Sequence, residues 1–278
     1  VVDITERVEA QNRIEELASK LSKYLSPQVY RSIFSGQKNV QIEANRKKLT
    51  VFFSDIKDFT ELTDRLEPEV LSSLLNSYLN EMSKIALKYG GTIDKFVGDA
   101  ILIFFGDPET NGEKADATSC VLMALEMRER MKFMRQIWED EGISRPLNIR
   151  IGINTGYCNV GNFGSEDRLD YTIIGGEVNL ASRLESNAPV GQILVSHETY
   201  SLIKNSIICE EREEINVKGL AHKVRTYQVI DKKEKNENGV TELKDNYDGF
   251  SLYIDLDVSR KAEVIASLEN ALAKIQKN

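Results

Sequence analysis

Residues 90–105 read GGTIDKFVGDAILIFF, and this stretch decides the fold. Two runs rich in apolar, β-branched and aromatic residues, 92–97 and 100–105, flank the dipeptide Gly98-Asp99. A Gly-Asp pair between two such runs is typical of a tight β-hairpin. The segment therefore predicts two antiparallel strands with an aspartate at the tip of their turn.

The segments on either side of the hairpin set the order of the elements. Upstream, KLTVFFSD (48–55) predicts a strand, and residues 59–89 predict a long helical stretch that ends at a Gly-Gly pair. Downstream, residues 114–141 predict a second long helix and residues 147–154 a further strand. The order β-α-β-β-α-β predicts an α+β, ferredoxin-like fold, in which a palm-type antiparallel sheet carries its helices on one face. The elements expected further along form a C-terminal extension of this sheet.

Composition and charge exclude several classes of protein. The 278 residues are 41% hydrophobic, which is enough for one large domain with appendages. The formal net charge of −8 argues against unspecific binding to nucleic acid or to an anionic membrane. The three cysteines form no CxxC pair, so neither a zinc site nor a disulfide framework is expected.

The ends of the chain and its hydropathy bear on location. No apolar run approaches the roughly 20 residues of a membrane helix, and the first residues do not form a signal peptide. We therefore expect a cytoplasmic segment without membrane contact. The chain begins with Val and not Met, so we expect a piece of a longer protein, and that protein can still be membrane-attached.

Two acidic residues stand where this topology brings strand ends together. Asp55 ends the first strand, and Asp99 lies at the hairpin tip. The first strand lies beside the hairpin in such a sheet, so the two carboxylates are expected side by side, where they repel each other unless a cation intervenes. Oxygen ligands suit Mg²⁺ or Mn²⁺, and two such ions suit an in-line displacement at phosphorus. The alternatives are a helix cap at Asp55 or Asp58 and simple turn chemistry at Gly98-Asp99.

The helix expected to follow Asp55 adds a second feature that fits a phosphate. The first backbone N–H groups of a helix have no partner within it. Those of Phe59 and Thr60 are therefore available to a phosphate oxygen.

A third segment, DYTIIGGEVNLASRLESNA (170–188), predicts a strand over residues 171–174 and a helix over residues 178–186 that carries Asn179 and Arg183 on one face. Asn can hold a sugar oxygen, and Arg can stabilise charge on a transferring phosphoryl group. From this segment alone, a solvated face with Arg183 paired to Glu177 or Glu185 is the better interpretation.

Taken together, these motifs resemble a known family. SDIKDFT (54–60), the hairpin segment, RIGINTG (150–156) and DYTIIGGEVNLASRLE (170–185), in this order and spacing, resemble the catalytic domain of class III adenylyl/guanylyl cyclases, closest to the bacterial cyanobacterial and soluble-cyclase type. The resemblance extends over residues 21–230. It implies an adenylate cyclase that converts ATP to 3′,5′-cyclic AMP and pyrophosphate.

The resemblance also implies roles for individual residues. Two Mg²⁺ or Mn²⁺ ions per active site would be held by Asp55, Asp99 and the backbone carbonyl of Ile56. Asn179 would orient the ribose, and Arg183 would stabilise the transition state. The phosphate-binding residues implied by the family pattern are Arg150 and, by the loosest match, Lys218.

The resemblance further implies that Lys95 and Thr172 recognise the purine base. Lys can donate to an adenine ring nitrogen, and a Thr hydroxyl can accept from the 6-amino group, whereas guanine has an acceptor at position 6. Family members that use GTP typically have Glu and Cys there, so this pair favours ATP, with guanylate cyclase as the alternative. Thr172, rather than Asp, also occurs in family members stimulated by bicarbonate, which makes bicarbonate an expected activator.

A head-to-tail homodimer is implied as well. Lys95 and Asp99 are four residues apart on one hairpin yet serve opposite ends of the nucleotide. One chain would supply Asp55, Asp99 and Arg150, and its partner would supply the groups that meet the purine, the ribose and the α-phosphate, which are Lys95, Thr172, Asn179, Arg183 and Lys218.

Three domains are expected. Residues 1–24 predict a signalling helix with coiled-coil spacing, or a helix lying on its own domain, and VVDITER resembles the end of a PAS sensor. Residues 25–230 form the catalytic domain. Residues 231–278 form the third, in which a polar linker is expected over 231–248, a strand over 250–257 and an amphipathic helix over 258–277. We assign no role to this part.

Two rival interpretations come from other classes of protein. A diguanylate cyclase would carry a GGDEF-like hairpin, whereas this one reads KFVGDA. A non-catalytic module that only binds nucleotide or dimerises would lack a metal aspartate or the transition-state arginine, and this chain has all of them.

Overall fold

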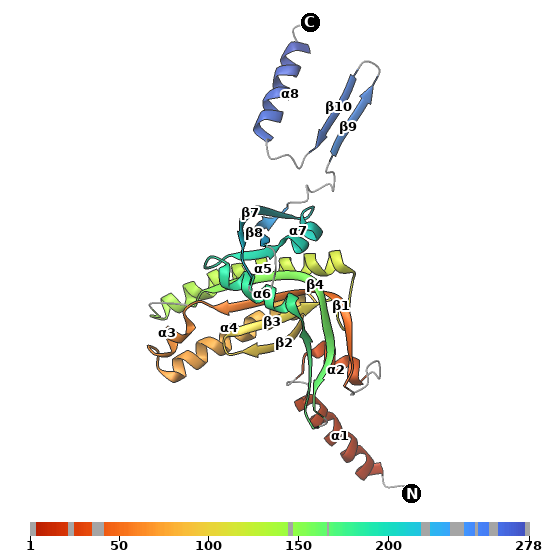
Figure 1. Ribbon diagram of the computed structural model, residues 1–278, viewed down its shortest axis with the longest axis vertical. Coiled ribbons are helices and arrows are strands. Elements are labelled where there is room, and N and C mark those ends of the chain that lie inside the picture. Colours follow the sequence, from red (N-terminus) through yellow and green to blue (C-terminus); the bar gives the residue numbers. More distant parts are fainter. Residues whose placement is uncertain are drawn as a thin grey trace. The chain divides into compact units, whose positions relative to one another are not determined.

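The structure is a computed structural model (Figure 1). It describes residues 4–21, 25–34, 42–143, 147–165, 167–217, 223–233, 242–247, 250–255 and 261–275. The chain divides into two units, Val1–Lys232 and Lys233–Asn278.

A mixed sheet organises the larger unit. Within the described residues it has eight strands in the order β2-β3-β1-β4-β6-β8-β7, with β5 paired to β4 beside this path. Only the pairing of β4 with β6 is parallel among the strand pairs described in this sheet. The strands are β1 (Ala44–Ile56), β2 (Thr92–Val97), β3 (Ala100–Phe105), β4 (Ile149–Gly164), β5 (Leu169–Ile174), β6 (Ile193–Ser196), β7 (Ile207–Ile215) and β8 (Val224–Lys232).

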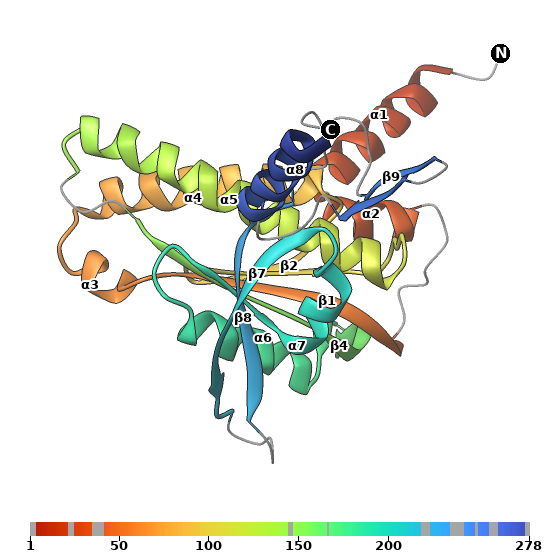
Figure 2. The same cartoon turned by 90° about the horizontal axis from the view of Figure 1, so that it is seen from above.

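Helices cover both faces of this sheet. The long helices α4 (Pro68–Lys88) and α5 (Glu113–Asp140) pack on one face, and α6 (Gly176–Asn187) packs on the other (Figure 2). Strand alternation explains the two layers, because neighbouring β1 residues point to opposite faces. Phe52 lies in the core under α4 and α5, and Val51 lies in the core under α6. The predicted α+β, ferredoxin-like arrangement is confirmed, and α6 belongs to its C-terminal extension.

The stretch expected as one helix over residues 59–89 is divided. It forms α3 (Phe59–Thr63) and α4, and Pro68 occupies the start of α4. Proline lacks an N–H and pushes the residue before it out of the helical region, and Glu67 has an extended ψ of 139°. The helical pattern of the side chains did not reveal this break.

Shorter helices complete the larger unit. They are α1 (Ile4–Leu21), α2 (Pro27–Phe34) and α7 (His197–Ile203). The expected N-terminal helix is therefore present. None of the helices in the described parts of the chain combines the length and apolar character needed to span a membrane.

The smaller unit contains β9 (Glu242–Tyr247), β10 (Phe250–Asp255) and α8 (Lys261–Ile275). The strand and helix expected near the C-terminus are present, but β9 falls inside the stretch expected as a linker. Its sequence, ELKDNY, is polar and has no strand pattern of its own. The antiparallel pairing with β10, in which Leu243 lies opposite Ile254, supplies the backbone hydrogen bonds that make it a strand.

Candidate active site

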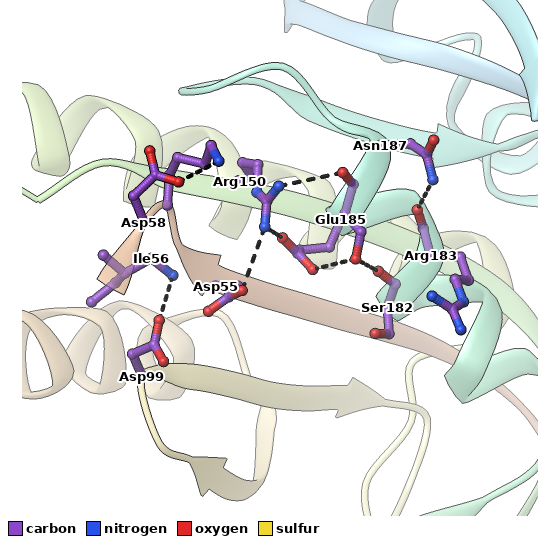
Figure 3. Close-up of polar contacts among 11 residues, drawn as sticks. Asp55, Ile56, Asp58, Asp99, Arg150, Ser182, Arg183, Glu185 and Asn187 are labelled. Carbon is purple, nitrogen blue, oxygen red and sulfur yellow. Dashed lines mark hydrogen bonds and ion pairs between the residues drawn. The ribbon is translucent and has the colours of Figure 1, made fainter. Parts of the chain in front are cut away.

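Asp55 and Asp99 meet at one edge of the sheet. β1 runs antiparallel to β3, with Ser54 opposite Ile101, so the next residue of β1 reaches the turn that carries Asp99. Gly98 takes a positive φ of 66° in that turn. The carboxylate of Asp99 accepts a hydrogen bond from the backbone N–H of Ile56 at 3.1 Å (Figure 3). Two acidic residues remote in sequence are thereby brought side by side.

The electrostatics of this pair favour a bound cation. Burial raises the pKa of Asp99, and the hydrogen bond with Asp55 and its negative charge raise it further, to about 7. Two neighbouring carboxylates oppose each other's ionisation unless a positive charge lies between them.

The groups at this edge fit a hard divalent cation such as Mg²⁺. The described residues contain no cluster of three or more His, Cys, Asp or Glu side chains that could hold a metal. Mg²⁺ is commonly held by one or two carboxylates together with substrate phosphates, so a pair of aspartates beside a backbone carbonyl suffices when a nucleotide supplies the remaining ligands.

Arg150 links this edge of the sheet to α6. It lies opposite Asp55 in the β1–β4 register, and its guanidinium is 3.5 Å from the Asp55 carboxylate and 2.9 Å from that of Glu185 (Figure 3). Glu185 is buried, which raises its pKa, while the charge of Arg150 counteracts this rise. The sequence named Glu185 only as a possible partner of Arg183. Its pairing with Arg150 was missed, because a glutamate on a helix gives no sign that a strand arginine lies beneath it.

Asn179 and Arg183 lie on the outer face of α6. The inner face is formed by buried residues that include Leu180, Ala181 and Leu184, whereas Asn179 and Arg183 are exposed. Figure 3 shows the Arg183 side chain on the far side of Ser182 from the Asp55 carboxylate. The two side chains therefore face outward from the domain.

The pairing of Arg183 with Glu177 or Glu185 is wrong. Glu185 pairs with Arg150, and Glu177 accepts a hydrogen bond from the Asn154 amide at 2.7 Å. Within the part of the chain that the structure describes, the Arg183 guanidinium has no hydrogen bond or ion pair. It is therefore available to a ligand.

Lys95 and Thr172 come together through Asp94. The Thr172 hydroxyl donates to the Asp94 carboxylate at 2.6 Å, and the Lys95 ammonium lies 3.3 Å from its other oxygen. Asp94 was not among the predicted site residues, although its position beside the predicted purine-reading Lys95 was a signal that could have identified it.

Asp55 and Lys95 share one face of the sheet. Lys95 lies opposite Leu102, and Leu102 lies opposite Phe53, which is two residues before Asp55 on β1. Residues two apart on a strand share a face. Asp55 and Lys95 therefore lie on the side of the sheet that α6 also covers.

The remaining predicted residues lie at α3 or outside the described residues. Phe59 and Thr60 open α3, which has five residues. Asp58 occupies the cap position with a positive φ of 57°, and its side chain makes no capping hydrogen bond, so the capping alternative for Asp58 is wrong. Lys218 lies outside the described residues.

Comparison with known proteins agrees with this geometry. A family model for the adenylate and guanylate cyclase catalytic domain matches residues 41–231. The chain is similar to the crystal structure of the adenylyl cyclase CyaB from P. aeruginosa, with 64% identity and a TM-score of 0.67, over 69% of this chain and 98% of that one. It is also similar to the guanylyl cyclase Cya2, with 34% identity and a TM-score of 0.66, over 70% of this chain and 98% of that one.

The curated relatives are longer than this chain. A terminal-differentiation specific adenylate cyclase of Dictyostelium discoideum is 34% identical over 84% of this chain, which spans 11% of that protein. The chain also spans less than half of the next three relatives. The family match itself covers more than half of the chain. The predicted resemblance is thus confirmed, and this chain belongs to the class III adenylate and guanylate cyclase catalytic domain family.

Proposed function

We propose that this chain is an adenylate cyclase, which converts ATP to 3′,5′-cyclic AMP and pyrophosphate in composite sites of a head-to-tail homodimer. The observation that carries the proposal is the meeting of Asp55 and Asp99, whose carboxylates oppose each other without a cation. Similarity to the adenylyl cyclase CyaB supports the choice of ATP.

Residues at the edge of the sheet would act on the triphosphate. Asp55, Asp99 and the Ile56 carbonyl would hold two divalent cations, which would supply positive charge beside the ribose 3′-hydroxyl and the phosphates. Arg150, already held by Asp55 and Glu185, would bind the β- and γ-phosphates together with Lys218. The free N–H groups of Phe59 and Thr60 would add hydrogen bonds to the same phosphates.

The second half of each site would come from the partner chain. Its Asn179 would orient the ribose, and its Arg183 would stabilise the charge that grows on the α-phosphate as the 3′-oxygen attacks. The exposure of both side chains supports this role. Large apolar side chains on β2 and β5 are also exposed, at 46% for Phe96, 56% for Val97 and 49% for Ile174, as expected for a surface that a second copy covers.

The direct test is product formation by the purified chain. With ATP and Mn²⁺ we expect cyclic AMP, and with GTP much less cyclic GMP. Faster turnover of GTP would favour the guanylate cyclase alternative, and nucleotide binding without turnover would favour the non-catalytic module. The same assay with bicarbonate added at fixed pH tests the proposed activation through Thr172, which a flat response would dismiss.

The purine preference is expected to follow Lys95 and Thr172. Because the pattern of donors and acceptors differs between adenine and guanine, Lys95→Glu with Thr172→Cys is expected to lower the ATP-to-GTP ratio of kcat/KM by about 100-fold. Each single substitution should give an intermediate ratio. Competition kinetics with both nucleotides measure the ratio, and an unchanged ratio in the double variant would remove both residues from purine selection.

We also propose that α1 forms a coiled coil with a second copy and relays the state of an upstream sensor domain. Ile14 and Leu17 are exposed by 62% and 53%, at a spacing typical of a coiled-coil seam. Ile14→Asp with Leu17→Asp is expected to raise the dimer dissociation constant by about tenfold or more, because apolar burial is lost. Analytical ultracentrifugation measures it, with Asn12→Asp, outside the seam, as control. An unchanged dimer would leave α1 without this role.

A further inference from the structure

The hairpin formed by β2 and β3 contains a β-bulge at Asp94. In the pairing of β2 with β3, Ile93 lies opposite Ile103 and Lys95 lies opposite Leu102, so Asp94 is an extra residue in the described ladder. A bulge changes the direction of a side chain relative to regular alternation. The Asp94 side chain is fully buried and reaches β5, where it contacts Thr172 and Ile173.

The hydrogen bonds at Asp94 determine which atom donates. One carboxylate oxygen accepts the backbone N–H of Ile173 at 3.1 Å and lies 2.6 Å from the Thr172 hydroxyl. The Lys95 ammonium is 3.3 Å from the other oxygen. Burial raises the pKa of Asp94 above its ordinary value, and the contacts with Thr172, Lys95 and Ile173 counteract only part of this rise. The Lys95 ammonium beside the carboxylate favours its ionised form. An ionised carboxylate only accepts, so the Thr172 hydroxyl must donate its single proton to Asp94.

Because its proton is donated to Asp94, the Thr172 hydroxyl can act only as an acceptor toward a further partner. A free hydroxyl can rotate and serve as donor or acceptor, but one whose proton is committed offers only its lone pairs to a further partner. Lone pairs attract the 6-amino group of adenine and repel the 6-oxo group of guanine or hypoxanthine. The selectivity of the hydroxyl thus depends on a residue behind it.

We propose that Asp94 is a positioning residue for substrate selection: by accepting the Thr172 proton, it makes that hydroxyl an obligatory acceptor that selects purines with a donor at position 6. The inference rests on the proposed function and deepens it. Asp94 itself need not touch the nucleotide. Loss of its carboxylate is expected to restore free rotation to the Thr172 hydroxyl.

The test compares ATP with inosine triphosphate, which carries an oxo group at position 6 and lacks the 2-amino group of GTP. Asp94→Ala is expected to lower the ATP-to-ITP ratio of kcat/KM by about tenfold, the effect of one hydrogen bond. Asp94→Asn, whose carbonyl can still accept from Thr172, should retain most of the wild-type ratio. Thr172→Ala should give the Asp94→Ala ratio, and the double variant should show no further loss.

Controls separate selection from folding. Asp170→Ala removes an exposed carboxylate two residues from Thr172 on β5 and should leave the ratio unchanged. Thermal melting reports whether each variant folds. If Asp94→Ala does not fold, Asp94→Val, which also lacks any acceptor for the Thr172 proton, replaces it with the same expected ratio.

The outcomes distinguish the two proposals. A folded Asp94→Ala or Asp94→Val variant that turns over more slowly but keeps the wild-type ATP-to-ITP ratio overturns the inference alone, because Asp94 then only supports the fold. A wild-type chain that makes no cyclic AMP overturns the proposed function and the inference with it.

Discussion

Asp99→Asn is expected to lower kcat for cyclic AMP formation by about 10³-fold, because a lost cation ligand removes several kcal/mol of charge stabilisation in the transition state. Asn has nearly the same shape and keeps an oxygen that can accept from the Ile56 N–H, so the hairpin should remain folded. Initial rates at saturating ATP and Mn²⁺ measure the effect. Asp64→Asn, at an exposed position after α3, is the matched control and should stay close to wild type.

The same substitution is also expected to raise the stability of the chain, because it removes one of two carboxylates that repel each other. The pKa of Asp99 is about 7 in the folded chain against an ordinary 3.8, so the stability associated with its protonated form is lost as pH rises through 7. At pH 8 with a chelator, Asp99→Asn should therefore melt at a higher temperature than wild type. An unchanged melting temperature would contradict the pairing of Asp99 with Asp55. Unchanged activity would contradict its role as a cation ligand.

Arg183→Ala is expected to lower kcat by about 10³-fold, as loss of an arginine that stabilises phosphoryl charge does elsewhere. Mixed with Asp99→Asn chains, however, it should recover activity. Random pairing makes half of the dimers mixed, and each mixed dimer has one intact site of two, so about a quarter of wild-type activity is expected.

A matched mixture controls for this recovery. Asp99→Asn and Asp55→Asn affect the same half of the site, so their mixed dimers contain no intact site and should remain inactive. Recovery in this mixture, or its absence with Arg183→Ala, would contradict sites shared between two chains. Activity assays on chains mixed, dissociated and reassembled at equal concentration decide between these outcomes.

Several features of this protein were predictable from the sequence because their causes are local. The hairpin tip at Gly98-Asp99 follows from turn chemistry between two apolar runs. The β-α-β-β-α-β order follows from hydrophobic periodicity, and this order places the first strand beside the hairpin. The expectation that Asp55 and Asp99 lie side by side could thus be made before any coordinates, and they do meet.

Pro68 indicates a helix boundary in the sequence, but the helical pattern on both sides of it led to the prediction of one continuous helix. The strand β9 shows the opposite limit, because its polar residues become a strand only by pairing with β10. Periodicity describes one segment at a time and does not include the partner that another segment supplies.

Sequence alone determined the family, the architecture and the residue types of the candidate site. Only the tertiary structure decided that Arg150 is held by Glu185, that Arg183 is left exposed, and that Asp94 reaches Thr172. These contacts join residues on different elements, and one of them depends on a bulge that displaces a strand by one residue. A bulge depends on how two neighbouring strands pair, so the sequence of β2 alone could not predict it.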